Sequence, residues 1–295
     1  MTAPVSELFD PARWTAVEAF GDLTDITYHH DTSGRIARIA FNRPEVRNAF
    51  RPQTVDELYR ALDDARQNVR IGVVLITGNG PSPKDGGWAF CSGGDVNTFR
   101  QGVESEEIDL PSEVRRGAEA LHAAIVDLRR IPYPVIAAVN GPAAGAGFSL
   151  ALACDTRIAS ETAFFACAYG RIGASPDGGM TYFLPRVVGP SRALEILLND
   201  PNMKAEDALA EKLVAEVVPP DELIDRAREK AEKLGSKAPH YVRMAKILVG
   251  GSIEHTLTEH LQLERHGIAD SMATEDLRNG VETFFGGGTP EFTGR

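Results

Sequence analysis

NGPAAGAGFSLALACD, residues 140–155, is the stretch that decides the fold. The segment that leads into it, 135–141 (VIAAVNG), begins with a continuous apolar run, which is typical of a strand covered on both faces. The segment 148–155 then suits a short buried helix. Between the two, the tripeptide Gly-Ala-Gly at 145–147 is expected to leave main-chain N–H groups bare at a helix N-terminus. The helix dipole there favours an oxygen that becomes negative.

Two other interpretations compete for this turn. A dinucleotide-binding turn would need a third glycine where Leu150 stands, and the helix has room for only about two turns before Thr156, so the sequence disfavours it. A plain tight turn, with small residues for close packing, explains the glycines as well. The turn therefore predicts a site for negative charge only in combination with other motifs.

A second glycine turn lies upstream, at the end of WAFCSGGD (88–95). One interpretation is a simple turn in which Asp95 caps the helix that follows. The functional interpretation is an exposed main-chain N–H at Ser92. Two donors from separate loops, one at Ser92 and one in the 145–147 turn, would then hold a single carbonyl oxygen.

Strands and helices alternate along the middle of the chain. Alternating or continuous apolar runs predict the strands, and apolar residues three or four apart predict the helices. The expected strands are 35–42, 72–78, 135–141 and 156–161, and the expected helices are 55–67, 112–130, 148–155, 190–198 and 205–213. We therefore expect an α/β fold with three parts. These parts are a polar N-terminal arm (1–21), one core (22–220) and a helical C-terminal segment (221–295).

The composition argues against a nucleic-acid or membrane protein. Hydrophobic residues make up 43% of the 295 residues, and the formal net charge is −11, which disfavours binding to nucleic acid or to anionic membranes. The apolar runs are too short to span a bilayer, and the first residues do not resemble a signal peptide. Three cysteines at no metal-like spacing indicate buried free thiols in a reducing compartment, so we expect a cytoplasmic protein.

Four motifs appear in the order and spacing of the crotonase, or enoyl-CoA hydratase/isomerase, superfamily. They are FNRPEVRNAF (41–50), AFCSGGD (89–95), AAVNGPAAGAGFSLALACD (137–155) and RIGASPDGGMTYFLPR (171–186) with the VVG that follows it. The resemblance extends from around residue 22 to the C-terminus. The first third is most similar to dihydroxynaphthoyl-CoA synthases, whereas the region after residue 140 is more similar to the enoyl-CoA isomerase branch.

The resemblance implies a crotonase-type spiral of ββα units with a C-terminal helical trimerisation region, assembled as a homotrimer or a dimer of trimers. It implies an acyl-CoA substrate, so that coenzyme A is part of the substrate and not a permanently bound cofactor. The sequence itself shows no metal, flavin or nicotinamide site.

The resemblance also assigns binding roles to particular residues. The backbone N–H groups of Ser92 and Ala146 map onto the family's oxyanion hole. The residues that map onto its substrate and coenzyme A contacts are Arg47, Ala49, Gly93, Gly94, Asp95 and Gly145. For Arg47, a solvated loop cation is an equally good explanation.

Departures from the family pattern bear on the reaction. Hydratases of the family use two glutamates, and those positions hold Ser149 and Tyr169 here. Because neither side chain ionises near neutral pH, the two cannot act as a carboxylate acid and base, and ordinary hydration is disfavoured. Dihydroxynaphthoyl-CoA synthases are expected to carry an Asp at position 169 and a Ser-x-Asp run at 174–176. This chain has neither.

Asp177 stands where enoyl-CoA isomerases of the family carry their single acid/base carboxylate. One carboxylate is enough for an isomerase, because the group that removes a proton from one carbon can return it two carbons along. The sequence Pro-Asp-Gly-Gly at 176–179 is also a good turn sequence, and a turn alone would explain it. The resemblance therefore predicts an enoyl-CoA isomerase with Asp177 as the acid/base.

Other functions stay open on the same residues. The family's chlorobenzoyl-CoA dehalogenases carry a nucleophilic Asp at the position of Asp177, and the family includes acyl-CoA hydrolases, so a covalent mechanism is one alternative. A hydratase-like lyase is another. The loss of both glutamates also fits a catalytically silent protein that binds coenzyme A esters. None of the seven histidines is assigned to catalysis, and His122 is expected on the surface.

Overall fold

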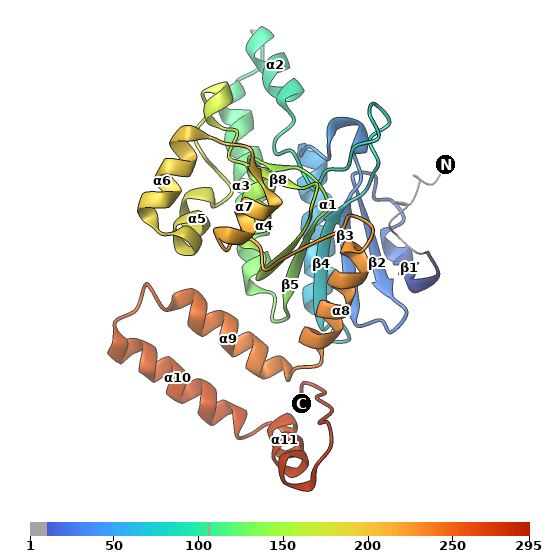
Figure 1. Cartoon of the computed structure of the whole chain (residues 1–295), viewed down its shortest axis with the longest axis vertical. Helices are drawn as coiled ribbons and strands as arrows, with labels where there is room; N and C mark the ends of the chain where they lie inside the picture. The colour runs from blue at the N-terminus through green and yellow to red at the C-terminus, as the bar shows by residue number, and fades with distance from the viewer. Residues whose placement is uncertain (1–10, 106) are drawn as a thin grey trace.

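A seven-stranded sheet forms the centre of the computed structural model, which describes residues 11–105 and 107–295 (Figure 1). Its strands lie in the order β1-β2-β3-β4-β5-β7-β10. The strands are β1 (Trp14–Ala16), β2 (Ile26–Asp31), β3 (Ile36–Phe41), β4 (Val73–Gly78), β5 (Val135–Val139), β7 (Thr156–Ser160) and β10 (Glu216–Val218). The first three are antiparallel neighbours, and every pair from β3 to β10 is parallel.

A second, three-stranded sheet lies beside the first and has the order β6-β8-β9. Its strands are β6 (Ala143–Ala144), β8 (Phe164–Ala166) and β9 (Met203–Lys204). β6 pairs parallel with β8, and β8 pairs antiparallel with β9. Because β6 belongs to the 140–155 stretch, this small sheet fixes the position of the downstream glycine turn.

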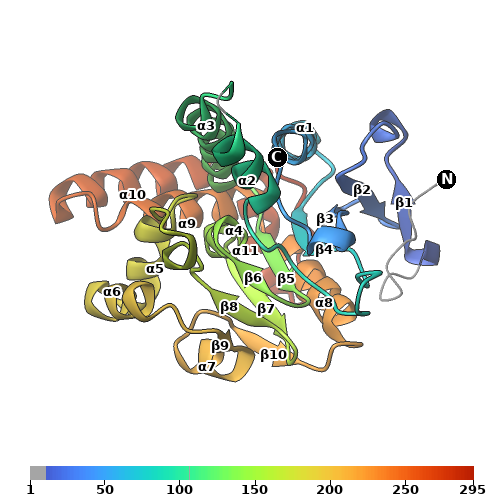
Figure 2. The same ribbon diagram turned by 90° about the horizontal axis from the view of Figure 1, so that it is seen from above.

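Helices cover both faces of the large sheet, which explains why the central parallel strands β4 and β5 are buried along their whole length. One face packs against α1 (Pro52–Gln67), α3 (Leu110–Arg130) and α4 (Ala146–Ala153), and the other packs against α8 (Leu223–Gly235) (Figure 2). The remaining helices of the core are α2 (Val96–Glu104), α5 (Met180–Val188), α6 (Pro190–Asn199) and α7 (Ala205–Ala210). Short 3-10 turns occur at Pro11–Arg13, Glu18–Phe20, Pro44–Val46 and Gly170–Ile172.

The last three helices lie below the sheet in Figure 1 and make few contacts with it. They are α9 (Pro239–Gly251), α10 (Leu257–Ser271) and α11 (Glu275–Gly286). Within α9, all of which is described, no residue is buried. Lys246 attaches α9 to the core, because its Nζ pairs with Asp155 at 2.7 Å and donates to Tyr133 O at 2.8 Å. This segment is therefore joined to the core by polar contacts and exposes most of its own surface.

The predicted α/β class is confirmed, and each expected strand and helix occurs close to its expected position. α5 is not among the expected helices, because Pro185 lies inside it and proline is disfavoured in a helix interior. The expected arm, 1–21, falls partly outside the described residues, and its described part contributes β1 to the sheet edge. The division at residues 22 and 221 stays a prediction. Among the described residues, no helix is long and apolar enough to cross a membrane.

Helix α4 is buried along its whole length. All eight of its residues are inaccessible to solvent, and they are apolar or small apart from Ser149. It is therefore a core helix with no solvent-facing side. The residue before it, Gly145, has φ +52°, a left-handed conformation that glycine adopts without steric cost. Only the N-terminal turn of α4 can meet a ligand, because the rest of the helix is covered.

The two glycine turns approach each other so closely that side chains are excluded. A Cβ atom built on Gly147 would lie 2.2 Å from Cys91 O, and one built on Gly141 would lie 2.2 Å from Trp88 O. The two segments are also joined by a hydrogen bond from Ala144 N–H to Cys91 O at 2.9 Å. Main chain therefore packs directly on main chain, and both turns reach the surface at one place.

This packing predicts that Gly147→Ala will lower the free energy of unfolding by about 3 kcal/mol, because the added methyl group cannot coexist with the Cys91 carbonyl. Gly117→Ala is the matched control, since a Cβ atom there meets nothing within 4 Å and alanine in the interior of α3 is expected to raise stability by about 0.5–1 kcal/mol. Urea denaturation followed by circular dichroism gives both values. Equal stability of the two variants would contradict the contact.

Candidate active site

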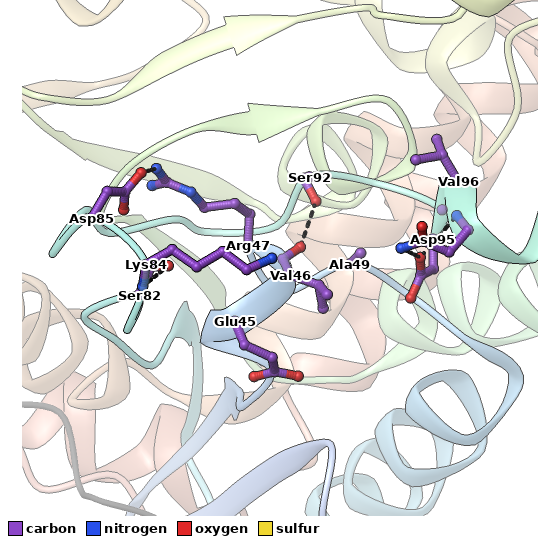
Figure 3. Close-up of a pocket in the computed structure, with 12 residues that line it drawn as sticks. Glu45, Val46, Arg47, Ala49, Ser82, Lys84, Asp85, Ser92, Asp95 and Val96 are labelled. Carbon is purple, nitrogen blue, oxygen red and sulfur yellow. Dashed lines mark hydrogen bonds and ion pairs between the residues drawn. The ribbon is translucent and has the colours of Figure 1, made fainter.

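A surface pocket of about 320 Å³ opens beside the upstream glycine turn (Figure 3). Three chain segments line it, 45–49, 82–85 and 92–97. The lining residues are Glu45, Val46, Arg47, Ala49, Ser82, Lys84, Asp85, Ser92, Gly94, Asp95, Val96 and Asn97. Four of the six residues predicted to contact substrate or coenzyme A are thus brought together here with Ser92 of the predicted oxyanion hole, although they come from two separate motifs. Gly93 and Gly145 are not among the lining residues.

Arg47 extends along one wall of the pocket. Arg47 and Asn48 both have left-handed backbone conformations, with φ values of 57° and 58°. The buried Asn48 side chain holds this turn by donating to Asn79 O at 3.0 Å and Ala89 O at 2.8 Å. The Arg47 guanidinium forms an ion pair with the Asp85 carboxylate, as Figure 3 shows. Of the two cations that line the pocket, Arg47 and Lys84, the first is therefore neutralised by a neighbouring loop.

The structure corrects the expectation of a free amide at Ser92. The Ser92 N–H donates to Arg47 O at 3.0 Å, so it already has an acceptor. Two residues later, the Gly94 N–H has no acceptor among the described residues, and Gly94 lines the pocket. The turn was thus predicted but the wrong amide was chosen, because the direction of each N–H depends on backbone angles that the motif does not reveal.

Ala146 supplies a second amide close to this turn. It is the first residue of α4, and its N–H also lacks an acceptor among the described residues. A Cβ atom built on Gly93 would lie 3.2 Å from Ala146 N, and Gly93 has φ +91°. Gly93 and Gly145 therefore act as the small residues that let the two turns meet. The amides of Gly94 and Ala146 come from facing turns and are the two donors available to a ligand atom.

Asp95 has the structural role that the alternative interpretation predicts. Its Oδ1 accepts a hydrogen bond from Asn97 N–H at 3.1 Å, which caps α2. Its Oδ2 pairs with Arg43 at 3.1 Å. Although Asp95 lines the pocket, both carboxylate oxygens already have partners, so its first role is to hold the helix and the turn together. Ala49 is buried next to it and contributes an apolar patch of wall.

The Asp177 carboxylate is half-buried, in the turn that precedes α5. Its carbonyl oxygen accepts from Met180 N–H at 3.0 Å, so the segment is a turn, as its sequence also suggests. Its Oδ1 accepts a hydrogen bond from the Tyr169 hydroxyl at 2.8 Å. The carboxylate is therefore fixed by the protein and does not extend freely into solvent.

Ser149 and Tyr169, at the two positions where hydratases carry glutamate, both contact Asp177. The Ser149 Oγ lies 3.0 Å from the Tyr169 hydroxyl and 2.9 Å from Asp177 O. Both side chains are buried, with exposed fractions of 0% and 9%. Burial, followed by the negative charge of Asp177, raises the pKa of Tyr169 well above its usual value. Tyr169 is therefore a permanent donor.

His122 contacts the turn that carries Asp177, which no sequence motif indicates. It lies on α3, 56 residues before Gly178, and its Nε2 accepts a hydrogen bond from Gly178 N–H at 3.1 Å. The expectation that it is exposed is correct, but its imidazole also contacts the residue directly after Asp177. Only the fold brings these two segments together, so no local motif could have indicated the contact.

Comparison with known proteins shows to which family the chain belongs. The family model described as "Enoyl-CoA hydratase/isomerase" matches residues 31–295. The chain belongs to the enoyl-CoA hydratase/isomerase family. The predicted family and the crotonase-type fold are thereby confirmed, as is the prediction of an enzyme of this family. The choice among the family's reactions stays a prediction.

Individual relatives span several reactions within the family. The chain is 44% identical to the 1,4-dihydroxy-2-naphthoyl-CoA synthase of Mycobacterium tuberculosis, over 83% of this chain and 80% of the relative. It is 33% identical to the 1,2-epoxyphenylacetyl-CoA isomerase of Escherichia coli, over 88% of this chain and 95% of the relative. The crystal structure of an enoyl-CoA hydratase from Bacillus anthracis superposes with a TM-score of 0.83 at 32% identity, over 92% of this chain and 100% of that one.

Proposed function

We propose that this family member is an acyl-CoA isomerase that shifts a carbon–carbon double bond through an enolate intermediate. The observation that carries the proposal is the single carboxylate of Asp177, held by Tyr169 against the first turn of α4. Neither hydratase position is acidic, so one group must both remove and return the proton. A double-bond shift is the reaction of this family that needs only one such group.

The two free amides supply the other half of the chemistry. When a proton leaves the carbon beside a thioester carbonyl, negative charge moves onto the carbonyl oxygen. The N–H groups of Gly94 and Ala146 stabilise that oxygen, and the N-terminus of α4 adds its dipole. Loss of one such donor typically costs about 3 kcal/mol of transition-state stabilisation. Asp177 then returns the proton two carbons farther along the dienolate, so the double bond comes into conjugation with the carbonyl.

The pocket beside these amides is a suitable place for the coenzyme A portion of the substrate. Arg47 and Lys84 are the cations of the lining that can contact a phosphate, and the Arg47 guanidinium is paired with Asp85. An entering phosphate must therefore exchange with the Asp85 carboxylate. Both side chains are substantially exposed, at 36% and 52%, so this ion pair contributes at most about 1 kcal/mol and can be displaced.

The relatives support an acyl-CoA substrate, because the names of the synthase, the isomerase and the hydratase all include a coenzyme A ester. The synthase relative has the higher identity of the first two. However, the acidic residues expected of that group at position 169 and at 174–176 are absent here. This difference at the reacting position favours the isomerase over the synthase.

A second candidate function is an acyl-CoA hydrolase or dehalogenase that uses Asp177 as a nucleophile. The observation that favours it is His122, whose Nε2 accepts from Gly178 N–H and would activate a water molecule near Asp177 once it releases that amide. In a dehalogenase, the carboxylate displaces halide and water then cleaves the resulting aryl ester. In a hydrolase, the carboxylate displaces coenzyme A and water then cleaves the resulting acid anhydride. The released product, free coenzyme A or a halide ion, distinguishes this candidate from the isomerase.

We also propose that the chain assembles into a homotrimer or a dimer of trimers through α9, α10 and α11. These helices expose large apolar side chains that the core does not cover. The most exposed are Tyr241, Val249, Ile253, Leu257, Phe284 and Phe285. Apolar surface of this extent on one segment is typical of an interface between subunits, and cyclic symmetry closes such an interface.

The isomerase proposal predicts that the protein converts a straight-chain 3-enoyl-CoA into the conjugated 2-enoyl-CoA and incorporates deuterium from heavy water. Asp177→Asn should lower this rate by at least about a hundredfold, because it removes the acid/base group. Asp56→Asn, at an exposed position on α1, is the control and should leave the rate unchanged. Mass spectrometry measures the deuterium, and ultraviolet absorbance measures conjugation.

The same assay separates the alternatives. Release of free coenzyme A or halide that requires both Asp177 and His122 would contradict the isomerase proposal. It would support the hydrolase or dehalogenase instead. Binding of the thioester without exchange or turnover would indicate a silent coenzyme A ester-binding protein. An Asp177→Asn variant as active as the wild type would contradict any catalytic role for this carboxylate.

The Arg47–Asp85 pair predicts that Asp85→Asn will bind coenzyme A about two- to fivefold more tightly, because Arg47 is freed for a phosphate. Arg47→Ala should bind more weakly. Asp63→Asn is the matched control, since it breaks a similar exposed ion pair with Arg66 on α1, outside the pocket. Isothermal titration calorimetry with coenzyme A gives the dissociation constants. Weaker binding by Asp85→Asn would show that Asp85 helps to hold the ligand.

The assembly proposal predicts a solution mass of three or six times the chain mass of 31.9 kDa. The double variant Ile253→Glu, Leu257→Glu should shift the protein towards a monomer, because charge is placed in the apolar interface. Val69→Glu is the control, at a position that is 90% exposed on the core. Size-exclusion chromatography with light scattering measures the masses, and a monomeric wild type would refute the assembly.

A further inference from the structure

We propose that Tyr169 is a positioning residue that fixes the Asp177 carboxylate so that Oδ2 is the oxygen that carries the proton. This inference rests on the proposed function and specifies how its site is built. The Tyr169 hydroxyl donates to Asp177 Oδ1 at 2.8 Å. Among the described residues, no group donates to Oδ2. One oxygen is thus held by the protein, and the other is left for the substrate.

Tyr169 can do this because its own position is fixed by buried neighbours. The Ser149 Oγ lies 3.0 Å from the Tyr169 hydroxyl and 2.9 Å from the Asp177 carbonyl oxygen, so a single serine contacts both partners. Ser149 is fully buried in α4, three residues after Ala146. The hydrogen-bonded chain therefore links the carboxylate to the same helical turn that carries the Ala146 amide.

The backbone before Tyr169 provides an independent sign that its orientation is constrained. Ala168 has φ +61°, a left-handed conformation that alanine rarely adopts. Its N–H donates to Asp200 Oδ1 at 2.8 Å, and Arg171 pairs with the other oxygen of that carboxylate at 2.9 Å. Strained conformations of this kind persist where the surroundings hold them, and they cluster at functional sites. Here the strained residue directly precedes the side chain that contacts Asp177.

The hydrogen bond has one main chemical consequence. It stops the carboxylate from rotating, so that Oδ2 keeps one direction during both proton transfers. Since Tyr169 remains protonated over the working range of pH, the donor is present throughout the reaction.

Tyr169→Phe tests this inference in the full-length protein with a 3-enoyl-CoA substrate. We expect kcat to fall roughly ten- to a hundredfold while KM changes less than about threefold, because the substrate's contacts are retained and the base is misplaced. Tyr59→Phe, which removes an exposed hydroxyl on α1, is the matched control and should change none of these values.

A second substitution keeps the test valid if Tyr169→Phe does not fold. Site-specific replacement of Tyr169 by 4-fluorophenylalanine fills the space of the hydroxyl but removes the donor. Its kcat should fall as far as that of the phenylalanine variant, and KM should again change less than about threefold. A purely structural role for Tyr169 would lower stability or raise KM and leave kcat unchanged in a folded variant, and that result would overturn the inference.

The outcomes separate this inference from the proposed function. A wild type with no Asp177-dependent double-bond shift would overturn the isomerase, and the assignment of Oδ2 with it. An active wild type with Tyr169 variants that keep its kcat would overturn the positioning role alone. Reduced kcat together with a nearly unchanged KM in the Tyr169 variants would support both.

Discussion

The packing of one bare main-chain turn directly on another is the constraint on which the site depends. Gly141 and Gly147 come so close to the carbonyls of Trp88 and Cys91 that no side chain fits between them. Because glycine is needed at these points of contact, two segments about fifty residues apart in the chain reach the surface together. The free amides of the family's site arise from this contact. Without it, each turn would expose an isolated N–H, which binds an oxygen only weakly.

The Asp177 carboxylate is organised by a different principle. Both positions that carry glutamate in hydratases of the family hold hydroxyl side chains here, and both contact Asp177. The neutral pair Ser149 and Tyr169 supports one acid instead of supplying two. A buried hydroxyl pair avoids the large cost of burying two charges, yet it still directs the half-buried carboxylate of Asp177. This part of the structure thus carries one carboxylate with two hydroxyl partners.

The sequence predicts the fold well, because strands buried on both faces must be continuously apolar and glycine turns must appear where main chains touch. It also predicts which segments form the pocket. It cannot predict which amide of the upstream turn is free, since Ser92 and Gly94 differ only in the direction of their N–H groups. The contact of His122 with Gly178 joins distant segments, and no local periodicity encodes it. Helix α5 is likewise not predictable from the sequence, because it contains Pro185 and tertiary packing overrides the unfavourable effect of that proline.

The complete burial of α4 contrasts with the exposure of residues 170–175, directly before Asp177. A helix with no free face tolerates almost no change, since every substitution alters core volume. The exposed residues 170–175 have no such restriction. An acidic side chain can be gained, lost or moved within this segment at little cost to stability, while the amides of Gly94 and Ala146 are retained. Divergence of reaction type among such proteins is therefore physically easy, and a new activity can arise in a protein that already folds.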